Sequence, residues 1–260
     1  KNIEAVEKWA LKKEEQEKRI KRNKEIEFTY LMDKIKKVKA MSIWIFIVPF
    51  VAINLCLILV THFHGLFPNR EDIIHPVFPY FDGGASISRT ARVFPTYLIF
   101  KPAMFFTSYC LIKYWLFNKS IIQSFDNNNK YLSKIIFFGV GSAVLLALHS
   151  IFLGIKIDND LYKFFRRFVM VSFIIFEVTA QTYLVLIFYS LRKKLNKFIN
   201  KRILKLKMYL VSVLLIVGII SIPILVMDGN KLLKHALEWD YFVGVISFYL
   251  LTFFMWKKIK

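Results

Sequence analysis

Lys101, His149 and Glu177 stand inside long apolar stretches of this sequence, where a charge is costly. A charged group in hydrocarbon costs about 2.5–3.5 kcal/mol on insertion scales, so each one needs a structural or chemical reason. Gln181 follows Glu177 by one helical turn, which places both side chains on one face of a helix. Glu238 stands at the opening of the last apolar stretch.

Three interpretations of these residues remain open. His149 and Glu177 lie at similar depths if their helices are antiparallel, so a hydrogen bond between them could fix helix packing. Together with Lys101, Gln181 and Glu238 they could instead surround a lipid headgroup. In a catalytic reading, His149 is the general base and Glu177 or Glu238 orients it, with the base within about 3.2 Å of the proton that it takes.

Motifs for other chemistry are missing from the sequence. No apolar stretch carries His-x-x-x-His or His-Glu-x-x-His, the spacings that put two metal ligands on one helix face. There is also no nucleophile elbow and no phosphate loop. We therefore predict neither a metal site nor a cofactor. Cys56 and Cys110 fall inside apolar stretches and are interpreted as small buried hydrophobic residues.

The elements that must position these residues are predicted to be membrane spans. The chain is 56% hydrophobic with a mean hydropathy of +0.46, more than a soluble domain of this length can bury. A span needs about 20 apolar residues, and six stretches qualify. We therefore predict an all-α polytopic integral membrane protein with six transmembrane helices. The predicted spans are 41–61, 97–117, 135–155, 168–190, 208–227 and 239–256.

Basic residues between the apolar stretches predict the orientation. Residues 1–40 carry thirteen, the connection 191–207 carries eight with no acid, and the tail 257–260 adds three. The positive-inside rule then places both termini in the cytoplasm, although 156–167 is basic on the opposite side. The net charge of +20 fits this pattern better than a nucleic-acid surface. The cations expected to meet anionic lipid or a partner are Arg192, Lys193, Lys194, Lys197, Lys201 and Arg202.

Three segments outside the apolar stretches carry further expectations. Residues 1–40 lack Gly and Pro and have acid-before-base pairs such as Glu14–Lys18, which predicts a cytoplasmic helix, either solvated or lying on anionic lipid or a partner. Residues 62–96, rich in Pro, Gly and aromatics, form an outer loop suited to binding a partner. The single sequon, at Asn118, falls on the cytoplasmic side and should stay bare.

Three short motifs, in this order along the chain, resemble a known family. Gly84-Ala85-Ser86-Ile87-Ser88 precedes the second span, His149 stands towards the end of the third, and Glu238-Trp239 opens the last. With six spans, this combination resembles the Frag/DRAM/Sfk superfamily, although Ala85 stands where the family has a proline. The residues that match the family motifs are Ser86, Ile87, Ser88, His149, Glu238 and Trp239.

The resemblance implies a six-helix bundle with cytoplasmic ends and a role in membrane lipid. Members include autophagy modulators of lysosomes, proteins that remodel the lipid of GPI anchors, and plasma-membrane proteins linked to lipid asymmetry. We therefore expect a non-enzymatic subunit of a membrane complex that transports or organises lipid, in the ER, Golgi, lysosome or plasma membrane. The alternatives are an enzyme that remodels lipid acyl chains and, third, a transporter or channel.

Overall fold

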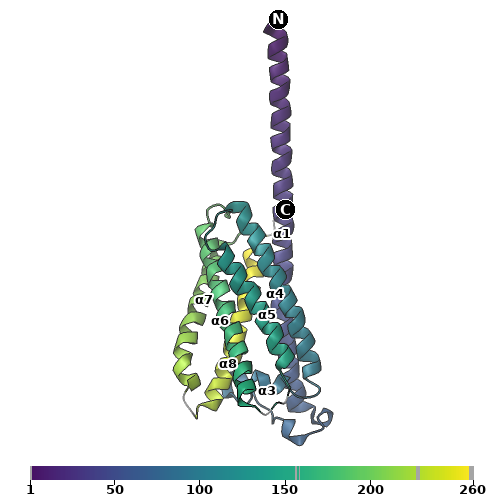
Figure 1. Cartoon of the computed structure of the whole chain (residues 1–260), viewed down its shortest axis with the longest axis vertical. Helices are drawn as coiled ribbons and strands as arrows, with labels where there is room; N and C mark the ends of the chain where they lie inside the picture. The colour runs from purple at the N-terminus through teal and green to yellow at the C-terminus, as the bar shows by residue number, and fades with distance from the viewer. Residues whose placement is uncertain (1, 156, 158, 227–228, 258–260) are drawn as a thin grey trace.

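The computed structural model describes residues 2–155, 157, 159–226 and 229–257, and within them the fold is all-α (Figure 1). The side chains of residues 2–8, 10–11 and 225–226 lie outside that description, as does most of the predicted tail 257–260. The α-helices are α1 (Asn2–His62), α2 (Pro79–Asp82), α3 (Ile87–Ala91), α4 (Tyr97–Phe125), α5 (Leu132–Phe152), α6 (Asp160–Ser190), α7 (Lys201–Val226) and α8 (Lys231–Met255). Two short 3-10 helices, η1 (His64–Leu66) and η2 (Arg70–Asp72), follow α1.

Helices α1, α4, α5, α6, α7 and α8 run side by side and alternate in direction (Figure 1). Helix α4 lies between α1 and α5, α6 follows α5, and α7 lies between α6 and α8. Helix α8 also contacts α1, so the chain closes a ring of helices. Helix α8 ends at Met255, towards the end of the bundle from which the first part of α1 projects (Figure 1).

Five helices in the described part of the chain are long and apolar enough to cross a membrane: α1, α5, α6, α7 and α8. The predicted span 97–117 lies in α4, which is not among the five and carries Lys101, Lys113 and Lys119 along its 29 residues. Each of the other predicted spans falls on one of the five helices within a few residues. Met227, the last residue of the predicted span 208–227, lies outside the described residues.

Helix α1 joins the predicted basic segment and the first span in one helix of 61 residues. Its side chains from Lys12 to Tyr30 are exposed, whereas Leu31, Ile35 and Val38 are buried against the bundle. This spacing of three to four residues is one face of a helix, so the buried face of α1 begins at Leu31. The predicted Glu14–Lys18 pair is present, with 2.6 Å between Nζ and the carboxylate.

Residues 63–96 fold over one end of the bundle, which we call the cap end. Helix α2 contacts α8, and α3 contacts both α1 and α8. Gly83 has a φ of 61°, and a Cβ at this position would lie 1.8 Å from the carbonyl oxygen of Leu232. Only glycine permits both this backbone conformation and so close an approach of α2 to α8.

Candidate functional site

A buried polar cluster surrounds Glu177, which is 1% exposed in the middle of α6. The hydroxyl of Ser142 on α5 lies 2.6 Å from Oε2, and the amide of Gln181 donates to Oε1 over 2.9 Å. The hydroxyl of Tyr249 on α8 donates to the same Oε1. Gln181 also donates to the carbonyl of Val245 on α8, over 3.2 Å. Glu177 and Gln181 therefore join α5, α6 and α8.

A second polar cluster surrounds Lys207 on α7, whose side chain is fully buried. Its Nζ donates to Oγ1 of Thr252 over 2.7 Å and lies 3.8 Å from the ring centroid of Phe248. The hydroxyl of Tyr114 on α4 is 3.2 Å from the same Oγ1. Because Thr252 donates its own proton to the carbonyl of Phe248, over 3.0 Å, it accepts from both Lys207 and Tyr114.

The two clusters meet at a pair of tyrosines. The rings of Tyr114 and Tyr249 have centroids 4.9 Å apart and stand edge to face at 72°. The resulting polar core runs from Ser142 through Glu177 to Lys207 and draws on α4, α5, α6, α7 and α8. Buried polar groups are costly when a partner is lost, so this arrangement fixes the rotation of each helix about its own axis. Its geometry favours a packing role over contact with a substrate.

His149 is half-buried on α5 and lies outside this polar core. The charged group that acts on it most is Arg166, near the start of α6. Among the hydrogen bonds of the described residues, none joins His149 to Glu177, whose carboxylate is taken by Ser142, Gln181 and Tyr249. The structure thus brings Gln181 to Glu177, as the helical spacing predicts, and leaves His149 near the cap end.

Lys101 also lies apart from Glu177. Its Nζ donates to the carbonyl of Ile151, in the last turn of α5, over 3.3 Å and lies 5.6 Å from the ring centroid of Tyr97. The last carbonyls of a helix lack partners within the helix, and a cation there is favourable. Lys101 therefore has a local structural role at the carboxyl end of α5.

Glu238 and Trp239 meet the motif Ser86–Ser88 at the cap end. The carboxylate of Glu238 lies beside the backbone amides of Ile87 and Ser88, which open α3. The indole of Trp239 donates to the carbonyl of Ala85 over 2.9 Å. Ser86 caps α3, since its Oγ accepts from the amide of Arg89 over 3.2 Å. Two motifs that lie 150 residues apart in the sequence therefore form one contact.

Two further contacts hold the cap onto α8 and α1. Tyr80 packs edge-on against Trp239, with ring centroids 4.9 Å apart, and its hydroxyl donates to Asn54 on α1 over 3.0 Å. Burial raises the pKa of Tyr80. His235 lies 2.9 Å from the carbonyl of Gly83. The five residues predicted to surround a lipid headgroup are thus divided among the polar core, the end of α5 and the cap.

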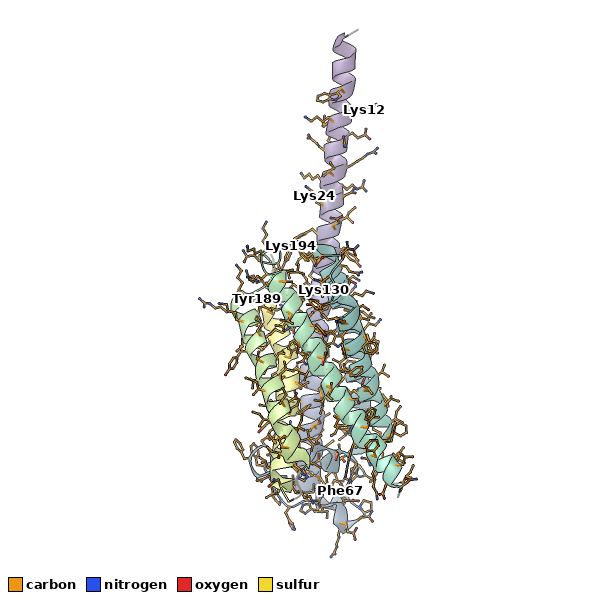
Figure 2. All side chains as sticks on the ribbon, turned by 60° about the vertical axis from the view of Figure 1, so that its left-hand side comes forward. Lys12, Lys24, Phe67, Lys130, Tyr189 and Lys194 are labelled. Atoms are coloured by element: carbon orange, nitrogen blue, oxygen red, sulfur yellow. The ribbon has the colours of Figure 1, made fainter. Side chains whose placement is uncertain are left out.

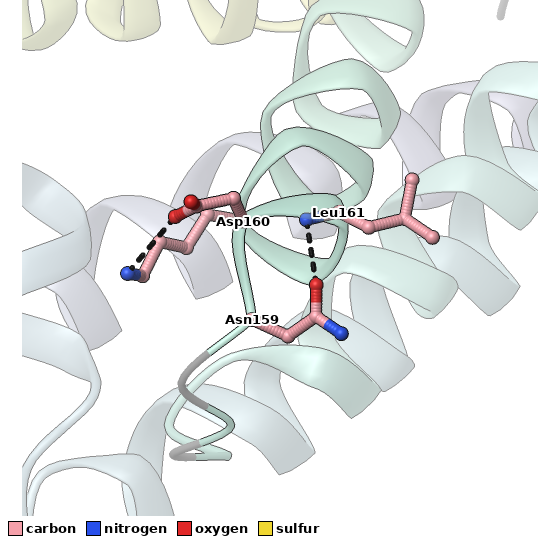
Figure 3. A network of polar contacts seen from close by, with 4 residues as sticks. Asn159, Asp160 and Leu161 are labelled. Carbon is pink, nitrogen blue, oxygen red and sulfur yellow. Dashed lines mark hydrogen bonds and ion pairs between the residues drawn. The ribbon is translucent and has the colours of Figure 1, made fainter.

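The start of α6 shows how the chain sets the position of Glu177 (Figure 3). Asn159 caps this helix, because its Oδ1 accepts from the amide of Leu161 over 2.8 Å. Asp160, the first helical residue, pairs with Lys163 at 3.3 Å. Asx residues favour helix starts, so this sequence begins α6 at Asp160 and places Glu177 almost five turns later.

The opposite end of the bundle, which we call the basic end, is closed by residues 191–200. Leu195 and Ile199 are fully buried, and Ile199 forms an antiparallel bridge with Trp256. Phe198 packs against Phe28 of α1, with ring centroids 6.2 Å apart. These apolar anchors hold the segment against the bundle, so the charged residues between them face outward.

The predicted surface cations lie on this segment and on the first turn of α7. Five are exposed, and Arg192 is half-exposed, with its guanidinium 4.0 Å from the ring centroid of Tyr189. Figure 2 shows Lys130 and Lys194 at this end and Phe67 at the opposite end. The six residues, which we call the basic plate, are Arg192, Lys193, Lys194, Lys197, Lys201 and Arg202.

Lys207 is the residue that sequence reasoning placed wrongly. It is one of the eight basic residues counted in the connection 191–207, yet its side chain is buried inside the bundle. Helix α7 begins at Lys201, so Lys207 already belongs to its second turn. The sequence does offer a partner for Lys207. Thr252 is the polar residue nearest the end of α8, and it lies at the same depth in the bundle as Lys207.

Asn118 cannot report the orientation. Its side chain is fully buried on α4, and its amide donates to the carbonyl of Tyr114 over 2.8 Å. The folded structure leaves no room for an oligosaccharide on this side chain.

Within the described residues, no three His, Cys, Asp or Glu side chains lie close enough to hold a metal ion. Comparison with protein-family models, with curated proteins and with solved structures gives no match to this chain. The resemblance to the Frag/DRAM/Sfk superfamily therefore stays a prediction.

Proposed function

We propose that this chain crosses the membrane six times, with both termini in the cytosol, and organises anionic lipid as a non-enzymatic subunit of a larger complex. Five long apolar helices support the membrane assignment. Helix α4 completes the set in this proposal, because it has 29 residues and lies between α1 and α5. The alternating directions of the six helices then place the basic plate on the same side as both termini.

The basic plate is the observation that carries the lipid role. Residues 191–207 contain eight basic residues and no acid, and only Lys207 of the eight is withdrawn into the bundle. The connection 62–96 at the cap end has three arginines and three acids. A cation near an anionic membrane surface gains about 1 kcal/mol, so the plate favours anionic lipid in the leaflet on its side.

The geometry of the carboxylates favours a non-enzymatic role. A catalytic His149 would need Glu177 or Glu238 as its orienting partner. Glu177 is held by Ser142 and Tyr249, and Glu238 lies beside the amides that open α3. Neither carboxylate is directed at the imidazole in this arrangement.

The orientation can be tested with single cysteines, because native Cys56 and Cys110 are buried. We place one cysteine at Lys197 in the basic plate and another at Phe81, which is 85% exposed at the cap end. A membrane-impermeant maleimide applied to intact cells or sealed vesicles should label Phe81→Cys from the extracytosolic side and Lys197→Cys only after permeabilisation. The reverse labelling would overturn the orientation.

The lipid role is tested by neutralising part of the plate. The variant Lys193→Gln/Lys197→Gln/Arg202→Gln should lower the affinity of the purified full chain for phosphatidylserine, relative to phosphatidylcholine, on the order of a hundredfold. The matched control, Lys12→Gln/Lys13→Gln/Lys24→Gln, removes the same charge from the projecting part of α1, where Figure 2 labels Lys12 and Lys24. Equal losses in the two variants would show that total charge, and not the plate, attracts the lipid.

A further inference from the structure

A pocket of about 640 Å³ opens on the outer surface of the bundle between α4 and α5, at the basic end. Its polar wall consists of amide, hydroxyl and ammonium groups from the last turns of α4, the connection and the start of α5. The polar side chains that line it include those of Lys119, Gln123, Asn127, Asn128 and Ser133. The volume lies within the range of about 300–1,000 Å³ that is usual for small-molecule sites.

The wall of the pocket that lies towards the middle of the bundle is apolar. It is formed by Leu132, Ile136 and Phe137 in the first turns of α5, and Phe137 is 63% exposed. The spans predicted at 97–117 and 135–155 place Ile136 and Phe137 within hydrocarbon. The polar wall falls just outside both spans, at the level of the lipid headgroups. The pocket therefore passes from polar to apolar along the membrane normal, as a phospholipid does.

The polar wall is available to a ligand. No side-chain hydrogen bond between described residues uses Lys119, Gln123, Asn127, Asn128 or Ser133. The one acid in the connection, Asp126, accepts from the amide of Asn129 over 2.8 Å and is not part of the wall. An anion would thus meet an ammonium group and several neutral donors, with no carboxylate in the wall to repel it.

We propose that this pocket binds one anionic phospholipid whose headgroup carries hydroxyl groups. A carboxamide both donates and accepts hydrogen bonds, so Gln123, Asn127 and Asn128 match hydroxyl groups, which do the same. Lys119 pairs with the phosphate, as a point charge suited to that group. Ile136 and Phe137 pack along the first part of an acyl chain.

This inference rests on the proposed function only in placing the basic end at the cytosolic leaflet. The basic plate attracts negative charge of any kind, whereas the pocket distinguishes headgroups by their hydroxyl groups. The two features adjoin, because Lys194 of the plate donates to the carbonyl of Phe125 at the end of α4, over 3.0 Å. The plate raises the local concentration of anionic lipid, and the pocket selects among those lipids.

The test compares lipids of equal charge on the purified full chain. Fluorescent phosphatidylinositol and phosphatidylglycerol carry hydroxyl-rich headgroups, and phosphatidylserine carries the same net charge without them. We expect the wild type to bind the first two about tenfold more tightly than phosphatidylserine. The variant Gln123→Leu/Asn128→Leu should bring that ratio close to one, and Lys119→Gln should weaken all three lipids.

The control is Asn196→Leu, which removes an exposed carboxamide at the same end but outside the pocket. It should keep the wild-type ratio, and unchanged elution in size exclusion shows that each variant is folded. Equal binding of the three lipids by the wild type, or an unchanged ratio in the double variant, would overturn the inference. If the proposed role of the basic plate were wrong, the result would differ: the wild type would show no preference for anionic lipid over phosphatidylcholine.

Discussion

The two ends of the bundle are closed in different ways. At the cap end, side chains of α8 bond to the backbone of a distant segment, as Trp239 does to the carbonyl of Ala85 and His235 to that of Gly83. At the basic end, apolar side chains such as Leu195 and Ile199 are buried and the charged residues between them project outward. Lysines at the basic end also donate to distant carbonyls, Lys39 to Trp256 and Lys194 to Phe125, each over 3.0 Å, but most cations of the basic plate remain exposed.

This difference indicates which end is built to meet a partner. A polar group that is satisfied within the chain contributes to a fixed geometry, and little of it remains for a ligand. A cation anchored next to a buried hydrophobic residue keeps its full charge for lipid or protein. The balanced charge of 62–96 and the uncompensated charge of 191–207 follow the same division.

The comparison is sharpest at two buried tryptophans of α8. Trp239 at the cap end is 0% exposed, and Trp256 at the basic end is 1% exposed. Each meets another aromatic ring, Tyr80 at 4.9 Å and Phe188 at 5.6 Å between centroids. The indole of Trp239 donates to Ala85, whereas the indole N–H of Trp256 has no hydrogen-bond partner among the described residues.

We therefore expect Trp239→Phe to lower the free energy of unfolding more than Trp256→Phe, by about 1–3 kcal/mol. Both substitutions remove a similar ring volume, but only the first leaves the carbonyl of Ala85 buried without its partner. Denaturant unfolding of the full chain in one detergent measures both values. Equal losses would mean that the hydrogen bond to the cap contributes nothing and that the two ends are closed by packing alone.

A smaller effect is expected where a side chain caps a short helix. Ser86→Ala removes the Oγ that accepts from the amide of Arg89, and the loss should be about 1 kcal/mol. Ser86→Gly should lower the free energy of unfolding by only about 0.3 kcal/mol, since glycine is tolerated at the N-cap position. Susceptibility of residues 62–96 to protease, measured beside global unfolding, locates the change.

The control for this prediction lies at the basic end. Ser124 donates to the carbonyl of Ser120 over 3.1 Å on an exposed face of α4, and its amide needs no cap. Ser124→Ala should therefore leave the free energy of unfolding unchanged within about 0.5 kcal/mol. A loss as large as that of Ser86→Ala would contradict the assignment of polar bonding to the cap end.

The helices could be predicted from the sequence because hydropathy and helix length are local properties. Each predicted span lies on a helix, and the basic segment 1–40 continues directly into the first. The exception is α4. Lysines interrupt its apolar residues, so the helix is not apolar enough to be counted among the candidate spans. Its place in the bundle comes from packing, as at Gly139, where a Cβ would lie 2.4 Å from the ring of Trp115.

The side-chain partners could not be predicted in the same way. They depend on the rotation of each helix about its axis, and a shift of one residue at a helix start turns every later side chain by about 100°. Glu177 and Gln181 share a face because both lie on α6, so that contact was predictable. The partners Ser142 and Tyr249 come from other helices, and Lys207 required knowing that α7 begins at Lys201.

The smallest effect is expected for the cations of the basic plate. Lys194→Gln and Lys197→Gln should each change the free energy of unfolding by less than about 0.5 kcal/mol, because both side chains are exposed and neither forms an ion pair among the described residues. Lys194→Gln also reduces the repulsion among neighbouring cations. This gain offsets the loss of the hydrogen bond from Lys194 to the carbonyl of Phe125. The same substitutions should lower the affinity for anionic vesicles, so one set of variants separates stability from binding. If Lys197→Gln destabilises the chain as much as Ser86→Ala does, the basic plate stabilises the fold, and its charges are not available to bind lipid.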